Sequence, residues 1–159
     1  MQKFTYKLLE DDTYCAMHYE GNDANVIIPS IFLGKPISIL YDSLFEGHTE
    51  IRSVEIPETV TDIGGFMFDG CSSLHQIKLP SGLKKIWQYG FVRSSIEEIT
   101  LPEGIIDIAP YTFKDCKRLR KIVCNTGLKR ISAWAFQGCD NLEEFIHGEK
   151  VEISPRAFE

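Results

Sequence analysis

The chain has 159 residues, of which 43% are hydrophobic and 25% charged, and this balance suits a single soluble domain rather than a disordered segment. Its formal net charge is -6 and its Lys and Arg residues are scattered among carboxylates, which argues against a nucleic-acid partner because phosphate binding needs clustered cations. No apolar run reaches the roughly 18 residues that a membrane span needs, so we expect no membrane insertion.

Residues 1–25 predict an N-terminal β-hairpin. The stretch "FTYKLLEDDTYCAMHYEG" alternates around an Asp-Asp turn, and a hairpin here would cap the apolar end of whatever follows. The first residues contain neither the apolar core nor the cleavage site of a secretory signal. We therefore expect a cytoplasmic protein if Met1 is the native start, and a cell-surface or secreted one if a signal peptide was removed.

Residues 26–159 consist of repeats. The units start near residues 26, 51, 74, 96, 119 and 142, and the starts from 51 onward are separated by 23, 22, 23 and 23 residues. A fixed period of this length predicts a solenoid in which each unit forms one coil. One coil buries too few apolar side chains to offset the entropy of ordering it, so neighbouring coils must complete its core. We expect one continuous domain.

Each unit has the same internal order. It opens with apolar residues two apart, such as Val54 and Ile56, which is the spacing of a short strand with one buried face. A proline follows in three of the units and ends the strand, because proline has no N–H to give to a ladder. A second apolar group and a phenylalanine come next, and the phenylalanines should fill the interior: Phe68, Phe91, Phe113 and Phe136.

Cysteine recurs in the repeat. Cys71, Cys116 and Cys139 each follow the repeat's phenylalanine by three residues, and none of the 5 cysteines forms a CxxC motif. A residue type that recurs at a fixed period favours packing over chemistry, and free cysteine is among the most buried residue types. The alternatives are a metal column, a disulfide, or a thiol nucleophile in which Cys71 would use His75 as its base. We expect neither catalysis nor a cofactor nor a metal.

These units resemble the BspA-like subfamily of leucine-rich repeats. The stretches "LHQIKLP", "AFQGC" and "FDGCSSL" carry the likeness, and "NVIIPSIFLGKPISILYDSLFEGHTEI" is similar to the family's first coil. The resemblance implies a mainly β, right-handed leucine-rich-repeat solenoid with short parallel strands, one per coil, behind an N-terminal β-hairpin cap. It also implies a bacterial, non-catalytic protein-protein interaction scaffold.

Two alternatives to an internal scaffold stay open. The family's theme of binding to host matrix proteins implies a microbial surface adhesin if the chain once carried a signal peptide, although fold alone does not transfer function. The last unit lacks a polar cap, and an open sheet edge there favours a structural protein that associates end to end with copies of itself.

Equivalent residues of successive coils form columns that offer candidate partner-binding residues. One exposed strand column holds Arg52, His75, Glu97 and Arg120, where alternating charges also fit a solvated face with weak ion pairs. Another strand column ends in Val123 and Ile146, which form an outward apolar patch unless the last units turn them inward or further sequence covers them.

An aromatic column is the remaining candidate. It lies three residues after the second apolar group and consists of Phe66, Tyr89, Tyr111 and Trp134, followed by Arg156. Such side chains either anchor a protein or glycan partner or stack between coils. Trp134 is the best single candidate for a binding residue.

Overall fold

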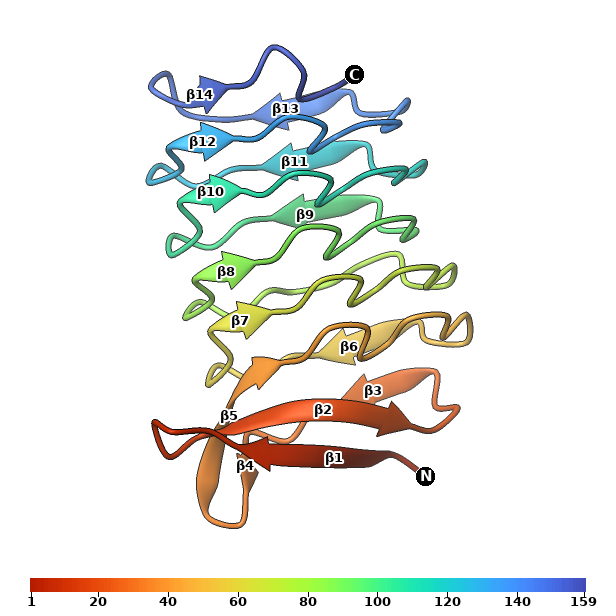
Figure 1. Cartoon of the computed structure of the whole chain (residues 1–159). Helices are drawn as coiled ribbons and strands as arrows, with labels where there is room; N and C mark the ends of the chain where they lie inside the picture. Colours follow the sequence, from red (N-terminus) through yellow and green to blue (C-terminus); the bar gives the residue numbers. More distant parts are fainter.

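The computed structural model describes all residues from 1 to 159 and contains strands and turns but no helix. No segment therefore has the form of a membrane-spanning helix. The chain winds as a stack of coils, and its two termini lie at opposite ends of the stack (Figure 1). We number six coils by their residues: 26–50, 51–73, 74–95, 96–118, 119–141 and 142–159.

The predicted hairpin is present at the N-terminal end. Strands β1 (Lys3–Leu8) and β2 (Tyr14–Glu20) pair antiparallel, and β2 pairs parallel with β5 (Lys35–Leu40) of the first coil. Tyr19 is buried, with its ring centroid 5.2 Å from that of Phe45. A small antiparallel hairpin of β4 (Ile31–Phe32) with β5 extends beside it. Together these strands cover the end of the apolar core.

Two columns of parallel strands run along the stack (Figure 1). The first strand face carries β3 (Asn25–Ile27), β6 (Ser53–Glu55), β9 (Glu98–Thr100), β11 (Lys121–Val123) and β13 (Glu144–Ile146). The second strand face carries β5, β7 (Asp62–Ile63), β8 (Lys85–Ile86), β10 (Asp107–Ile108), β12 (Arg130–Ile131) and β14 (Glu152–Ile153).

The solenoid fold is as predicted, but most coils contribute two strands where the sequence predicted one, and the first coil contributes three. The strands of the second face after β5 have two residues each, which is too short for a period-2 pattern to show in the sequence.

A third face is formed by the turns that carry the phenylalanines. Two columns of this turn face have a left-handed backbone: Ser43, Phe66, Tyr89, Tyr111 and Trp134 with φ of 53–62°, and Gly47, Gly70, Arg93, Asp115 and Gly138 with φ of 55–77°. Several of their amides donate to carbonyls of the next coil, as Phe66 does to Tyr89 at 3.1 Å and Trp134 to Arg156 at 2.8 Å. These bonds between coils offset the unfavourable backbone conformation of the residues that are not glycine.

The core is a column of stacked rings. Phe45, Phe68, Phe91, Phe113 and Phe136 are at most 1% exposed, and neighbouring ring centroids lie 5.0–5.8 Å apart. The column ends at Phe158, which is 50% exposed. The phenylalanines therefore fill the interior, as their period predicted.

The third coil interrupts both strand faces. On the first face, residues 75–79 form no ladder and make only the isolated bridges Glu55 to Lys78 and Gln76 to Glu98. On the second face, β8 pairs with β7 but not with β10, and the step between β8 and β10 is visibly wider than that between β10 and β12 (Figure 1). This is the coil with 22 residues instead of 23, because its turn at 94–95 is one residue short.

Candidate functional site

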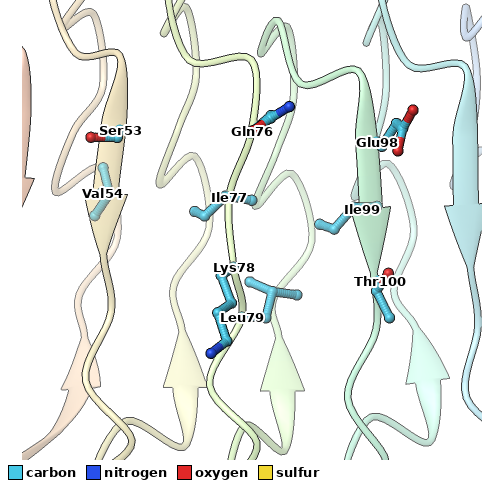
Figure 2. Close-up of a pocket in the computed structure, with 9 residues that line it drawn as sticks. All are labelled: Ser53, Val54, Gln76, Ile77, Lys78, Leu79, Glu98, Ile99 and Thr100. Atoms are coloured by element: carbon cyan, nitrogen blue, oxygen red, sulfur yellow. The ribbon is translucent and has the colours of Figure 1, made fainter.

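A hollow of about 730 Å³ opens on the first strand face beside the interrupted ladder. Figure 2 shows its lining on three neighbouring segments: Ser53, Val54, Gln76, Ile77, Lys78, Leu79, Glu98, Ile99 and Thr100. Ile77 is only half-buried, whereas its column neighbours Val54 and Ile99 are buried. Polar side chains surround this partly exposed apolar floor, which is the composition of a small protein-binding surface.

The charged column borders this hollow, and its charges pair with each other toward the C-terminal side. Glu97 accepts from Arg118 at 2.6 Å, and it lies 3.8 Å from Arg120 and 4.0 Å from His75. Arg52, at the other end of the column, has no ion pair within 4.0 Å. The structure thus places the four predicted residues on one face, and the unpaired cation, Arg52, lies in the second coil.

Val123 and Ile146 lie side by side in the ladder of β11 and β13. Both point outward in register with Thr100, and Ile146 is 47% exposed. The last coil keeps the strand register, so it does not turn Ile146 inward. An apolar strip therefore continues the first strand face toward the C-terminal end.

The aromatic column forms a continuous stack on the turn face. Ring centroids are 4.7 Å apart for Phe66 and Tyr89, 4.8 Å for Tyr89 and Tyr111, and 5.3 Å for Tyr111 and Trp134, with interplanar angles of at most 9°. The guanidinium of Arg156 lies 5.8 Å from the Trp134 ring. Inside this stack each ring covers the faces of its neighbours, so mainly ring edges are open to a partner.

The cysteine column bonds one coil to the preceding one. The thiols of Cys71, Cys116 and Cys139 donate to the carbonyl oxygens of Phe45, Phe91 and Phe113 at 3.1, 3.0 and 2.9 Å. All five cysteines are free.

The thiol of Cys71 is poorly suited to act as a nucleophile. Burial, with the carboxylates of Glu50 and Asp69 nearby, raises the pKa of Cys71 to about 12, so the thiol stays protonated. His75 shares no hydrogen bond with Cys71, and its Nδ1 lies 3.4 Å from the carbonyl oxygen of Ser95. No group of three or more His, Cys, Asp or Glu side chains is placed to hold a metal ion.

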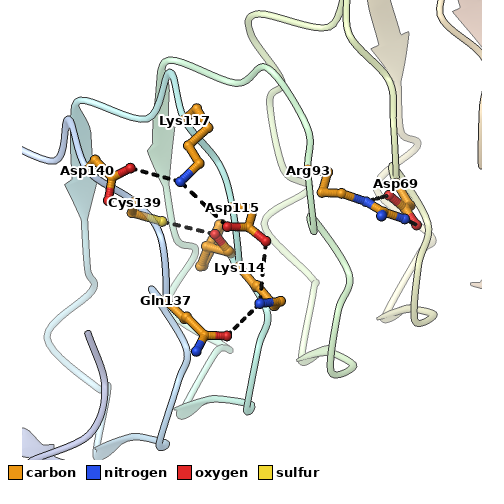
Figure 3. A network of polar contacts seen from close by, with 9 residues as sticks. Asp69, Arg93, Lys114, Asp115, Lys117, Gln137, Cys139 and Asp140 are labelled. Atoms are coloured by element: carbon orange, nitrogen blue, oxygen red, sulfur yellow. Dashed lines mark hydrogen bonds and ion pairs between the residues drawn. The ribbon is translucent and has the colours of Figure 1, made fainter. Parts of the chain in front are cut away.

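A polar network on the turn face was not predicted. Figure 3 shows Arg93 bound to Asp69 through two hydrogen bonds of 2.8 and 2.7 Å, and Asp115 between Lys114 and Lys117. Lys117 also pairs with Asp140 of the next coil at 2.8 Å. The sequence signal is the replacement of glycine by Arg93 and Asp115 at the left-handed position. These bonds hold neighbouring turns together.

A second hollow, of about 400 Å³, lies on the second strand face between the hairpin and the first three coils. Its lining includes Tyr41, Gly64 and Trp87, which are 23 residues apart and occupy one column. The sequence analysis missed this site because it compared only the strand columns and the aromatic column. The regular spacing of the three residues was the signal available.

The sequence pattern described as "BspA type Leucine rich repeat region" matches residues 38–159 in six copies. Among solved structures, a leucine-rich repeat protein from T. pallidum is 29% identical with a TM-score of 0.75, and the match covers 94% of this chain and 82% of that protein. A leucine-rich repeat protein from Bacteroides capillosus is 22% identical with a TM-score of 0.64 over 77% of this chain and 94% of that one.

The pneumococcal vaccine antigen PcpA shares the fold at 17% identity, with a TM-score of 0.74 over 94% of this chain and 39% of its own length. No curated protein sequence matches the chain.

Proposed function

Because this chain belongs to the BspA-type leucine-rich repeat family, we propose that it is a non-catalytic scaffold that binds a protein partner through its first strand face. Leucine-rich repeat proteins generally mediate protein interactions, and the family is typically non-enzymatic. An extended flat face built from repeated coils suits a large partner better than a small substrate.

The observation that carries the proposal is the hollow at the interrupted ladder. The backbone N–H groups of His75 and Gln76 donate to no protein acceptor, whereas the equivalent groups of Arg120 and Lys121 both donate to Glu97. Unpaired amides beside an exposed apolar floor offer a partner both hydrogen bonds and buried area. The apolar strip of Val123 and Ile146 extends the same surface.

The aromatic column has a supporting role in this proposal. Its ring faces are covered by stacking, so a partner meets only the edges of Tyr89, Tyr111 and Trp134. The column then keeps the coils in register rather than anchoring the partner. The variant Trp134→Glu, used as a further bait, is expected to weaken the aromatic stack without removing the strand-face surface.

Affinity capture with the purified chain as bait tests the proposal. One arm uses lysate of the producing cell and the other uses extracellular matrix proteins, with Lys78→Glu and Ile146→Glu as strand-face variants. Ile106→Glu is the matched control, because Ile106 is also 47% exposed but lies beside the second strand face. We expect wild type and control to capture the partner. The strand-face variants should bind it at least about 10-fold more weakly, as substitutions at a binding hot spot do.

Other outcomes separate the alternatives. Capture from matrix proteins alone, with the same loss, identifies the microbial surface adhesin. A partner lost only with Trp134→Glu contradicts the strand-face assignment and assigns binding to the aromatic column. A partner retained by every variant contradicts both surfaces.

Self-assembly is a second candidate, and one observation favours it. The last coil presents the half-exposed ring of Phe158 together with the unpaired edges of β13 and β14. Open edges and an uncovered apolar ring are features through which a second copy would dock. Light scattering over a wide concentration range tests this idea, and a monomer at every concentration contradicts it.

A further inference from the structure

The hollow on the second strand face lies between two exposed aromatic side chains. Leu40, Ile63 and Ile86 pair in register and point into the core, so the next residues along these strands, Tyr41, Gly64 and Trp87, lie in one column. Tyr41 is 48% exposed and Trp87 is 47% exposed. With Gly64 as floor, we call this site the aromatic groove.

The width of the aromatic groove follows from the coil spacing. Tyr41 and Trp87 are two coil steps apart, roughly 10 Å. Gly64 cannot carry a side chain, because a Cβ there would lie 2.6 Å from both the backbone nitrogen and Oδ1 of Asp42. In the aromatic column, rings one step apart stack at 4.7–5.3 Å, and Tyr89 fills the space between Phe66 and Tyr111. No side chain of the intervening coil therefore fills the space between Tyr41 and Trp87.

Two carboxylates on its wall have no cationic partner. Asp42 accepts from the Gly65 N–H at 2.8 Å and Asp62 from the Thr61 hydroxyl at 2.7 Å, and neither has an ion pair within 4.0 Å. Each carboxylate keeps one oxygen without a hydrogen bond. Lys7 is the one cation among the lining residues, and it pairs with neither carboxylate.

Lys85 is the nearest candidate partner for Asp62, but it does not pair with it. It lies directly opposite Asp62 in the ladder, yet its ammonium sits 3.9 Å from the centre of the Trp87 ring instead of pairing with the carboxylate. At the equivalent position of the fourth and fifth coils, Asp107 and Arg130 do pair, at 2.7 Å. The Trp87 ring thus already attracts a cation, while the carboxylate beside it is left free.

We propose that the aromatic groove binds an arginine side chain presented by a protein partner. A guanidinium is planar, stacks on aromatic faces and donates to carboxylates in a fixed fork, so it matches the space, the rings and the charges together. This inference rests on the proposed function only in that a protein supplies the arginine. The groove lies on the second strand face, apart from the first-face hollow.

A titration with short peptides tests the site by itself. The chain has 2 tryptophans, so the indole N–H signals of Trp87 and Trp134 in the ¹⁵N-labelled protein report on the groove and on a distant position. The probes are end-blocked Gly-Arg-Gly and the same peptide with citrulline, which has the shape of arginine without its charge. We expect the Trp87 signal alone to shift and saturate with arginine, with a Kd roughly in the millimolar range for a single side chain.

Variants assign the response to the groove. Asp62→Asn and Tyr41→Ala should each weaken arginine binding about 5-fold or more, because they remove the charge and one ring. Asp107→Asn is the matched control on the same face, since its carboxylate already pairs with Arg130, and it should leave binding unchanged. Far-ultraviolet circular dichroism confirms that each variant is folded.

Three results would overturn the inference: no saturable shift of the Trp87 signal, an equal response to citrulline, or full arginine binding by Asp62→Asn. None of them affects capture through the first strand face. Conversely, partner capture that ignores the strand-face variants overturns the proposed surface and leaves the peptide titration intact. The two proposals can therefore fail separately.

Discussion

Arg93 has a left-handed backbone conformation that glycine adopts at three equivalent positions of other coils. Its φ is 55°, and a left-handed conformation costs a residue with a side chain about 1–2 kcal/mol. Its guanidinium binds both oxygens of Asp69, whose side chain is only 4% exposed. A buried carboxylate without a partner is costly, so the ion pair offsets the backbone cost.

Replacing Arg93 separates these two effects. We expect Arg93→Ala to lower the free energy of unfolding by about 3 kcal/mol, because Asp69 loses its partner. Arg93→Gly should lower it by about 1 kcal/mol less, since glycine relieves the backbone. Urea denaturation measures both values.

The matched control for Arg93 is Arg118→Ala. Arg118 is 57% exposed, compared with 64% for Arg93, and it pairs with the less buried Glu97. An exposed pair of this kind contributes less than about 1 kcal/mol. Equal losses in Arg93→Ala and Arg118→Ala would show that the burial of Asp69 does not matter.

The buried thiol of Cys71 makes stability depend on alkaline pH. In the folded protein its pKa is raised to about 12, whereas a thiol in an unfolded chain has a pKa of about 8.5. Above that pH the unfolded state has lost a proton that the native state keeps. The contribution of Cys71 is therefore fully present below about pH 8.5, and it falls by about 1.4 kcal/mol per pH unit as pH rises toward the folded pKa.

Cys71→Ser should make this dependence less steep, because a serine hydroxyl does not ionise in the range. It should not remove the dependence, because burial also raises the pKa of Cys15 and of Cys124 to about 11. Ser94 already occupies the same column in the third coil. The measurement is the urea midpoint at pH 8, 9 and 10 for the wild type and the variant. Parallel pH profiles for the two proteins would mean that Cys71 titrates normally in the folded state.

At the scale of elements, the aromatic column should act as one cooperative unit. Tyr89→Ala removes a ring that is stacked on both sides, so we expect a loss of about 2 kcal/mol in the free energy of unfolding. Tyr89→Phe keeps the ring, and the Tyr89 hydroxyl makes no hydrogen bond within the protein, so this variant should stay within about 0.5 kcal/mol of the wild type.

A double-mutant cycle checks the cooperativity of the stack. Tyr89 and Tyr111 are in direct contact at 4.8 Å, so Tyr89→Ala and Tyr111→Ala should not be additive. Additive losses would show that each ring packs mainly against its own coil.

At the scale of the whole molecule, the third coil should divide the stack into two parts with different protection. Amide hydrogen exchange is expected to be fast at His75 and Gln76, which have no acceptor, and slow at Arg120 and Lys121, which donate to Glu97. Nuclear magnetic resonance resolves these amides one by one. Equal protection of the two pairs would show that the first strand face closes in solution.

The periodic parts of the fold were predictable from the sequence. The phenylalanine column and the first strands repeat every 22 or 23 residues, so the period itself placed them. The two-residue strands of the second face were too short to show a pattern. No residue type that usually ends a strand marks the place in the third coil where the ladder is interrupted.

The candidate sites were predictable only in part. The charged column and the outward direction of Val123 and Ile146 follow from alternation along the strands. The aromatic groove joins Tyr41, Gly64 and Trp87 from three coils, and the unpaired state of Asp62 depends on where the flexible side chain of Lys85 goes. Sequence alone does not determine that choice.

The cysteine column has a consequence for how such a protein can lengthen. The thiols of Cys71, Cys116 and Cys139 reach back to the phenylalanine carbonyl of the coil before them, whereas the third coil has Ser94 at this position. A cysteine-bearing coil of 23 residues that is duplicated in place therefore brings both the donor and the acceptor of this contact. Length, and with it the area open to a partner, can change by a single genetic event.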